Sequence, residues 1–290
     1  MNRGLVAWSA LMVGLAVDAG AQSLGMAPDA TDGVTAVSPL QVEMHRAHRD
    51  RAWDAVAHGG PLLPIPRGTL GEAEQQLFER LRARDAGGAI QHLQKHNPRV
   101  DLSDEHHHTA LTLAVPLGDV GLVRELLRRG ASPDEAGWRG FTPLGLAAYL
   151  GHDVSVRELL RRGADPLVRS QGGQTALHLA MAGGQTGSAR LLLDALPLDQ
   201  WMSAYNAAGR HPLAEAAFFG RQEAVRDMLA RGASPGAPDR HGLDALHAAA
   251  LGRQILVAEH LMAAGLMPRQ PLTALLLSRM YQPLDEIPAP

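Results

Sequence analysis

Cysteine is absent from all 290 residues, so the chain cannot form a disulfide, carry a thiol nucleophile or bind a metal through thiolates. Lysine occurs once, at Lys95, and arginine supplies the other 26 of the 27 basic residues. Against 30 acidic residues these leave a formal net charge of −3, so no field of one sign indicates nucleic acid as a partner. Aromatic residues make up only 4% of the chain, so the position of each one is informative.

The N-terminal residues have the order that is typical of an export signal. Arg3 carries positive charge, residues 4–17 are apolar, and small residues at 19–21 precede Gln22. The apolar run is shorter than the roughly 20 residues of a bilayer-spanning helix, and an uncleaved anchor is the alternative. We expect a signal peptide over residues 1–21, cut after Ala21, and a periplasmic protein with no membrane span after cleavage.

Residues 22–71 lack a strong helical or strand pattern. Residues 22–38 are small and polar, 39–58 carry only a ragged apolar stripe, and 59–68 are rich in proline and glycine. This composition predicts a disordered or partly helical N-terminal segment followed by a linker.

From residue 72 onward the chain repeats itself. The stretch "GFTPLGLAAYLGHDVSVRELLRRGADP", beginning at Gly140, has close counterparts upstream and downstream. The residues that open each first helix are spaced by 33, 33, 36 and 33: Thr109, Thr142, Thr175, His211 and Asp244. Glycines close the second helices in the same rhythm: Gly130, Gly163, Gly232 and Gly265. A fixed period of this length is typical of a solenoid.

Each part of the repeat has a structural purpose. Thr142 is placed to cap a helix, and Pro143 follows at a position where a missing N–H costs nothing. Gly151 can adopt the left-handed conformation that ends the helix. Each helix has at most about three turns and is too short to persist alone, so the pairs must be stabilised by burying apolar faces on their neighbours.

These residues resemble the ankyrin repeat, whose pattern reads DxxGxTPLHxAAxxGHxxxVxxLLxxGA. "GQTALHLAMAGG" and "GLDALHAAALGR" match the same core. The resemblance implies an all-α ankyrin-repeat solenoid over residues 72–268, made of stacked helix pairs joined by β-hairpin loops. We expect about five clear repeats, at 104–136, 137–169, 170–205, 206–238 and 239–268. A degenerate first repeat precedes them, and a capping helix and tail follow over 269–290.

The third clear repeat departs from the pattern. Leu196 stands where the closing glycine should be, and three extra residues precede His211. The segment "LDQWMSAYN" predicts an extra helical turn capped by Asp199, with a bulge or bend in the stack there.

The sequence contains few candidates for catalytic or metal-binding residues. It contains neither the glycine-rich P-loop nor the HExxH zinc motif. The run His106–His108 is the candidate metal site, but a solvated turn is the better interpretation, and the resemblance assigns His178 and His247 structural roles. We therefore expect no enzyme, no catalytic or metal residues and no cofactor; a metal-binding or enzymatic protein using loop 106–108 is the alternative.

The resemblance instead places a binding surface on the concave side, where hairpin tips and exposed first-helix positions meet. The candidate protein-binding residues are Trp138, Leu146, Tyr149, Leu150, Leu179, Trp201, Glu215, Phe218, Phe219 and Leu251. Packing between repeats is the alternative role for each. Aromatic side chains on such a ridge are typical of a binding hot spot.

We interpret the sequence as an exported protein that is monomeric when free and binds another protein, with no nucleic acid as partner. The partner could be a secreted enzyme or toxin that this protein inhibits, as immunity proteins do. An accessory that supports or protects a periplasmic enzyme is equally compatible. A structural spacer of the cell envelope is a third alternative.

Overall fold

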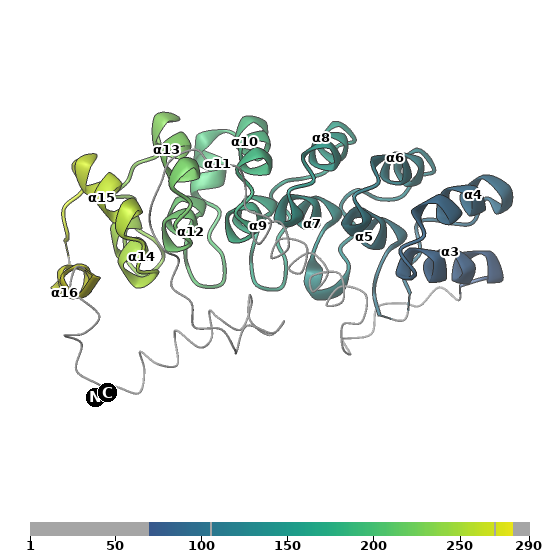
Figure 1. Cartoon of the computed structure of the whole chain (residues 1–290), viewed down its shortest axis with the longest axis horizontal. Helices are drawn as coiled ribbons and strands as arrows, with labels where there is room; N and C mark the ends of the chain where they lie inside the picture. Colours follow the sequence, from purple (N-terminus) through teal and green to yellow (C-terminus); the bar gives the residue numbers. More distant parts are fainter. Residues whose placement is uncertain (1–69, 105, 270, 281–290) are drawn as a thin grey trace, which may run out of the picture.

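The computed structural model describes residues 70–104, 106–269 and 271–280. Its helices form two rows, with the first helix of each pair in one row and the second helix in the other (Figure 1). The first row consists of α3 (Glu72–Arg82), α5 (Ala110–Ala114), α7 (Pro143–Leu150), α9 (Ala176–Gly183), α12 (Pro212–Phe218), α14 (Ala245–Leu251) and α16 (Pro271–Met280). The second row consists of α4 (Ala86–His96), α6 (Val120–Arg128), α8 (Asp153–Arg161), α10 (Thr186–Ala195), α13 (Gln222–Ala230) and α15 (Ile255–Ala263).

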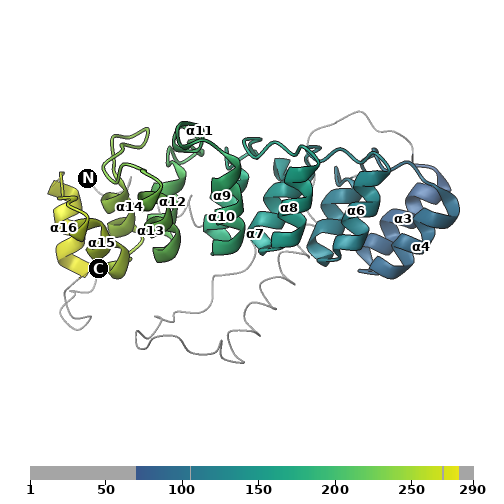
Figure 2. The ribbon, with the colours of Figure 1, turned by 90° about the horizontal axis from the view of Figure 1, so that it is seen from above.

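The expected all-α stack of helix pairs is therefore confirmed. Seen from above, the connections that lead from one pair to the next gather along one edge of the stack (Figure 2). Among the described residues, no helix combines the length and the apolar character that crossing a bilayer requires. The predicted signal peptide over 1–21 and the segment 22–69 lie outside the described residues.

Side chains set where the first helices begin. Thr142 Oγ1 accepts a hydrogen bond of 3.0 Å from the backbone N of Gly145, and Pro143 occupies the first helical position, both as predicted. In the last pair, Asp244 Oδ1 accepts a bond of 2.9 Å from the backbone N of His247. The caps satisfy backbone N–H groups that would otherwise lack partners at the buried helix starts.

Left-handed glycines end the helices, as the sequence predicts. Gly151 follows α7 with φ 73° and ψ 28°. The four glycines after the second helices have φ between 85° and 93°: Gly130, Gly163, Gly232 and Gly265. Leu196, which replaces this glycine after α10, is extended at φ −124° and ψ 138°. A side chain is disfavoured in the left-handed region, so the chain leaves α10 in a different direction.

The insertion after α10 forms one additional helical turn, α11 (Leu198–Met202). The predicted turn exists, but the predicted cap is wrong, because Pro197 holds the cap position and Asp199 lies inside the helix. Trp201 on this turn is only 2% exposed and belongs to the hydrophobic core, so it is not a surface residue. The turn is held to the stack by burying the largest side chain of the segment.

The loops between pairs have the shape of hairpins but contain no strands within the described residues, which corrects the expected β-hairpins. Each loop closes with a backbone hydrogen bond across four residues, as from Ser170 N to the carbonyl of Gln174 at 2.9 Å. From the second loop onward, each loop is joined to the next by a single backbone bond, as from Gln171 N to the carbonyl of Arg139 at 3.0 Å. One such bond per neighbour is too few for a ladder, so the loops remain turns.

The ends of the stack are covered differently. At the N-terminal end, α3 and α4 bury Phe78, Leu81 and Leu93, as a degenerate first repeat should, while Ile90 is partly buried. At the C-terminal end α16 packs against α14. The second helix α15 exposes Ile255 and Leu256, which are 38% and 59% accessible.

Glycine permits close contact between first helices of neighbouring pairs. A Cβ added to Gly183 in α9 would overlap the carbonyl oxygen of Tyr149 in α7. A Cβ added to Gly252, at the end of α14, would overlap the carbonyl oxygen of Phe218 in α12. Because both obstacles are backbone atoms, they cannot rotate away. These glycines therefore set how closely neighbouring pairs approach.

The first prediction concerns Gly183→Ala. Alanine favours a helix over glycine by about 1 kcal/mol, yet we expect this change to lower the free energy of unfolding by about 1–3 kcal/mol through the backbone clash. Gly87→Ala in α4 is the matched control, since its Cβ would come no closer than 4.0 Å to Asp85 Oδ1. The control should be neutral or stabilising. Urea denaturation measures the free energy of unfolding of both variants. If both variants change it in the same direction, the close approach of the two backbones at Gly183 is contradicted.

Candidate binding face

Four of the ten candidate binding residues are buried. Leu146 and Leu179 are 7% and 6% exposed, because side chains at this position pack between neighbouring first helices. Leu179 Cδ1, for example, lies 2.8 Å from the site that a Cβ on Gly145 would occupy. Glu215 is 1% exposed because it forms an internal ion pair, and Trp201 is buried as described above. Their assignment to an accessible surface is therefore wrong.

Six candidates remain accessible. Leu251 is 41% exposed at the end of α14. Five are partly exposed: Trp138, Tyr149, Leu150, Phe218 and Phe219. The rings of Phe218 and Phe219 meet edge to face at 5.2 Å, and Trp138 lies 6.4 Å from the ring of Phe141. These residues lie on loop tips and at the C-terminal ends of first helices.

Arginine accompanies the aromatic residues, a feature that the sequence interpretation missed. Arg139 lies over the ring of Trp138 at 4.5 Å, and Arg240 lies over the ring of Tyr205 at 5.4 Å. We call the surface formed by these tips and the adjoining helix ends the loop–helix face: Trp138, Arg139, Phe141, Tyr149, Arg169, Tyr205, Phe218, Phe219 and Arg240. The position of these residues in the repeat could have identified them, since several come just before the loop glycine or just before the residue that caps the next helix.

Two arginines fasten this face to the helices beneath it. Arg210 lies 4.0 Å over the ring of Phe218, and its Nε donates to Glu215 Oε2 at 2.6 Å. Arg221 donates to the carbonyl oxygens of Met181 and Ala182 at 2.8 and 2.9 Å, which satisfies the last turn of α9 from the next repeat. Arg210 joins the loop to the helix of its own repeat and Arg221 joins its repeat to the preceding one, so the aromatic side chains at the helix ends have fixed surroundings.

The histidine-rich loop is organised around Asp104. Asp104 Oδ1 accepts from the backbone N of His106 and of His108, and its Oδ2 lies 3.2 Å from His108 Nδ1 and 2.6 Å from Arg82 Nη2. Burial raises the pKa of the Asp104 carboxyl, but the hydrogen bonds from His108 and Arg82 outweigh it and lower the pKa to about 2. His107 adopts φ +62°, in the place where other loops have glycine.

This geometry does not assemble metal ligands. His108 is fully buried, with one ring nitrogen facing Asp104, and His107 is at the turn. Within the parts of the chain that the structure describes, no three His, Asp or Glu side chains come together as a metal site would require.

Three further repeats carry buried histidines at or near the start of the first helix: His178, His211 and His247. His178 Nδ1 lies 2.9 Å from Thr175 Oγ1, and its Nε2 lies 3.1 Å from the carbonyl oxygen of Arg210 in the next repeat. His211 Nδ1 accepts from the backbone N of Ala214, so this histidine replaces threonine as a helix cap. Burial lowers the pKa of His178 to about 4 and also lowers the pKa of His211 and His247.

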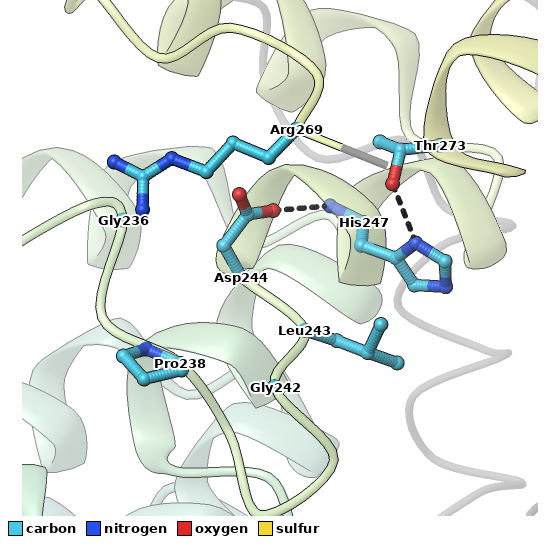
Figure 3. Close-up of a pocket in the computed structure, with 8 residues that line it drawn as sticks. All are labelled: Gly236, Pro238, Gly242, Leu243, Asp244, His247, Arg269 and Thr273. Atoms are coloured by element: carbon cyan, nitrogen blue, oxygen red, sulfur yellow. Dashed lines mark hydrogen bonds between the residues drawn. The ribbon is translucent and has the colours of Figure 1, made fainter. Parts of the chain in front are cut away.

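A small cavity lies between the last loop and α16. It has a volume of about 70 Å³, and Asp244, His247 and Thr273 line one side of it (Figure 3). His247 Nδ1 is hydrogen-bonded to Thr273 Oγ1 at 2.7 Å. A space of this size accommodates a few waters rather than a substrate, and its polar groups already hold α16 to α14.

One short sequence invites a catalytic interpretation. Residues 232–236 read Gly-Ala-Ser-Pro-Gly, which matches G-x-S-x-G. In hydrolases that motif joins a strand to a helix and exposes a strained serine. Here Ser234 lies in the loop after α13, and the described residues around it contain no strand, so the motif does not have its catalytic context.

Comparison with known proteins gives one family. A family model described as ankyrin repeats (3 copies) matches residues 82–170 and 144–239, which together span more than half of the chain. A search of curated proteins gives no match.

Proposed function

Because the chain belongs to the ankyrin-repeat family, whose repeats are modules of protein–protein interaction, we propose that it binds a partner protein on its loop–helix face. The observation that carries this proposal is the distribution of aromatic residues. Six of the eleven aromatic residues in the chain lie on this face, although the helices beneath it are rich in alanine. Tryptophan, tyrosine and arginine are the residues that contribute most to protein interfaces.

The face is suited to binding without large rearrangement. Arg221 holds the end of the preceding repeat's first helix through hydrogen bonds to Met181 and Ala182, and Arg210 holds Phe218 within its own repeat through a ring contact. Backbone bonds also link the loops that carry Arg139, Gln171, Ala207 and Arg240. A surface that is ordered before binding loses little conformational entropy when a partner docks, so more of the contact energy becomes affinity.

We further propose that the protein is exported and that its partner is a periplasmic or secreted enzyme, which it inhibits. The N-terminal charge and apolar pattern support export, and the pre-formed face supports a tight one-to-one complex. Cell fractionation with N-terminal sequencing tests the cut after Ala21, and the stoichiometry of the purified complex tests the inhibitor. A chain that keeps residues 1–21 or stays in the cytoplasm would contradict the location.

The second prediction is that Trp138→Ala, Tyr149→Ala and Phe218→Ala, combined, abolish partner capture from periplasmic extract. Hot-spot residues cost about 2 kcal/mol or more each when truncated, so binding should fall by over a hundredfold. The matched control is Val154→Ala with Leu256→Ala, two exposed apolar residues of the outer helices, 53% and 59% accessible. Circular dichroism must show that both variants keep their helices. Loss of capture in the control alone would place the binding site elsewhere.

A further inference from the structure

The arginines of the loops differ from those of the outer helices in what they contact. Most outer arginines lie within ion-pair distance of a carboxylate: Arg124 and Arg162 with Glu158, Arg129 with Glu125, Arg190 with Asp227, and Arg231 with Asp194. Across the described residues, Arg139, Arg169 and Arg240 have no such carboxylate. The loops therefore carry three arginines that form no ion pair with a carboxylate of the described residues, and what positions them has to be explained.

These three arginines are instead positioned by aromatic residues. Arg139 and Arg240 stack over Trp138 and Tyr205. Arg169 Nη1 donates to the backbone carbonyl of Tyr205. Tyr205, beside the loop at 206–210, therefore contacts one arginine from the loop before it and one from the loop after it. A guanidinium that stacks on a ring keeps its in-plane N–H groups available for carboxylate oxygens.

The acidic residues of the loops do not neutralise them. Asp239 Oδ1 accepts from the backbone N of His241 and Leu243, at 2.7 and 2.9 Å, so it serves the turn. Asp165 similarly accepts from Leu167 N at 2.8 Å. Glu135, three residues before Trp138 in the sequence, is exposed, and Glu105 lies outside the described residues. Arg169 and Arg240 are themselves exposed, so positive charge is presented at the tips.

Building on the proposed function, we propose that the partner protein presents a cluster of carboxylates to Arg139, Arg169 and Arg240, with Trp138 and Tyr205 making the apolar contacts between them. A protein surface fits better than a long polyanion. The whole chain carries a net charge of −3, so a long nucleic acid would be repelled by the surface around the loop tips. An acidic patch on a protein needs to contact only the three arginines.

The test uses the purified chain and a displayed library of random 12-residue peptides. The variant is Arg139→Gln/Arg169→Gln/Arg240→Gln. The matched control is Arg157→Gln/Arg190→Gln/Arg226→Gln, which removes the same charge from α8, α10 and α13. Peptides enriched by the unaltered chain and by the control should contain more Asp and Glu than the starting library. By fluorescence anisotropy they should bind the variant at least about tenfold more weakly.

The outcomes separate this inference from the proposed function. Peptides that need Trp138, Tyr149 and Phe218, yet show no acidic enrichment and bind the arginine variant normally, overturn the acidic partner and leave the binding face intact. Enrichment that neither the aromatic nor the arginine variant alters overturns the binding face itself. A labelled single-stranded oligonucleotide that binds more tightly than the enriched peptides overturns the assignment to a protein partner.

Discussion

Glu215→Ala is expected to lower the free energy of unfolding by about 3–5 kcal/mol. The Glu215 and Arg210 side chains are only 1% and 8% exposed, and their oxygen and nitrogen lie 2.6 Å apart. Glu215 Oε2 also accepts from Asn206 Nδ2 at 3.1 Å. Removing the carboxylate leaves a buried guanidinium whose Nη2 already lacks a partner in the structure. A buried charge without its counter-ion is far more costly than the pair itself is stabilising.

Asp194→Ala is the matched control for this prediction. Asp194 also accepts from an arginine, Arg231, at 2.7 Å, but its side chain is 63% exposed. Solvent screens such a pair, so the expected loss is below about 1 kcal/mol. A double variant, Arg210→Met/Glu215→Leu, should recover most of the stability, because no unpaired charge remains. Chemical denaturation measures the free energy of unfolding of all three variants. Equal losses for Glu215→Ala and Asp194→Ala would contradict the high cost of an unpaired buried charge.

Acid is expected to destabilise the fold between pH 6.5 and 4, before most carboxylates are protonated. Burial lowers the pKa of His178 to about 4 in the folded state, whereas an unfolded histidine has its ordinary value of 6.5. The unfolded chain therefore binds more protons in this interval, and stability falls as the pH falls. The difference in pKa corresponds to about 3 kcal/mol from His178 alone, with further loss from His211 and His247.

Thermal unfolding at pH 7, 6, 5 and 4 measures this loss. His178→Gln should flatten the pH dependence, although it also lowers stability at pH 7. Asp104 acts in a different window. Its pKa of about 2 in the folded state means that its contribution is complete above its ordinary value of 3.8 and is lost only as the pH falls toward 2. A melting temperature that is constant from pH 7 to 4 would contradict the lowered pKa values of the buried histidines.

The architecture could be predicted because its determinants are local and periodic. Thr142 and Pro143 specify a helix start within four residues, and Gly151 specifies its end. Copies spaced by 33 residues place the same signals at regular intervals, so one repeat predicts the next. Leu196 likewise marks the irregular repeat correctly, because a missing glycine is visible in the sequence alone.

The accessibility of the candidate binding residues was predicted only in part, because burial depends on tertiary neighbours that periodicity does not reveal. Leu179 packs near Gly145 across two helices, and Glu215 is buried by an arginine and an asparagine of its own loop. Leu179 and Glu215 occupy the same position of the repeat, and the sequence pattern predicts that this position is accessible, because the pattern describes one helix at a time. It carries no information about which side of that helix the adjacent pair covers.

The sequence by itself determined the repeat, the family and the starts and ends of helices such as α7, because caps and closing glycines act locally and recur at a fixed spacing. Only the tertiary structure decided which aromatic residues reach solvent and which arginines accompany them. Arg240 contacts Tyr205 from the following loop, and Arg221 contacts the end of α9 in the preceding repeat. Such contacts exist only when the pairs are stacked at a particular spacing, and that spacing depends on backbone approaches at residues such as Gly183.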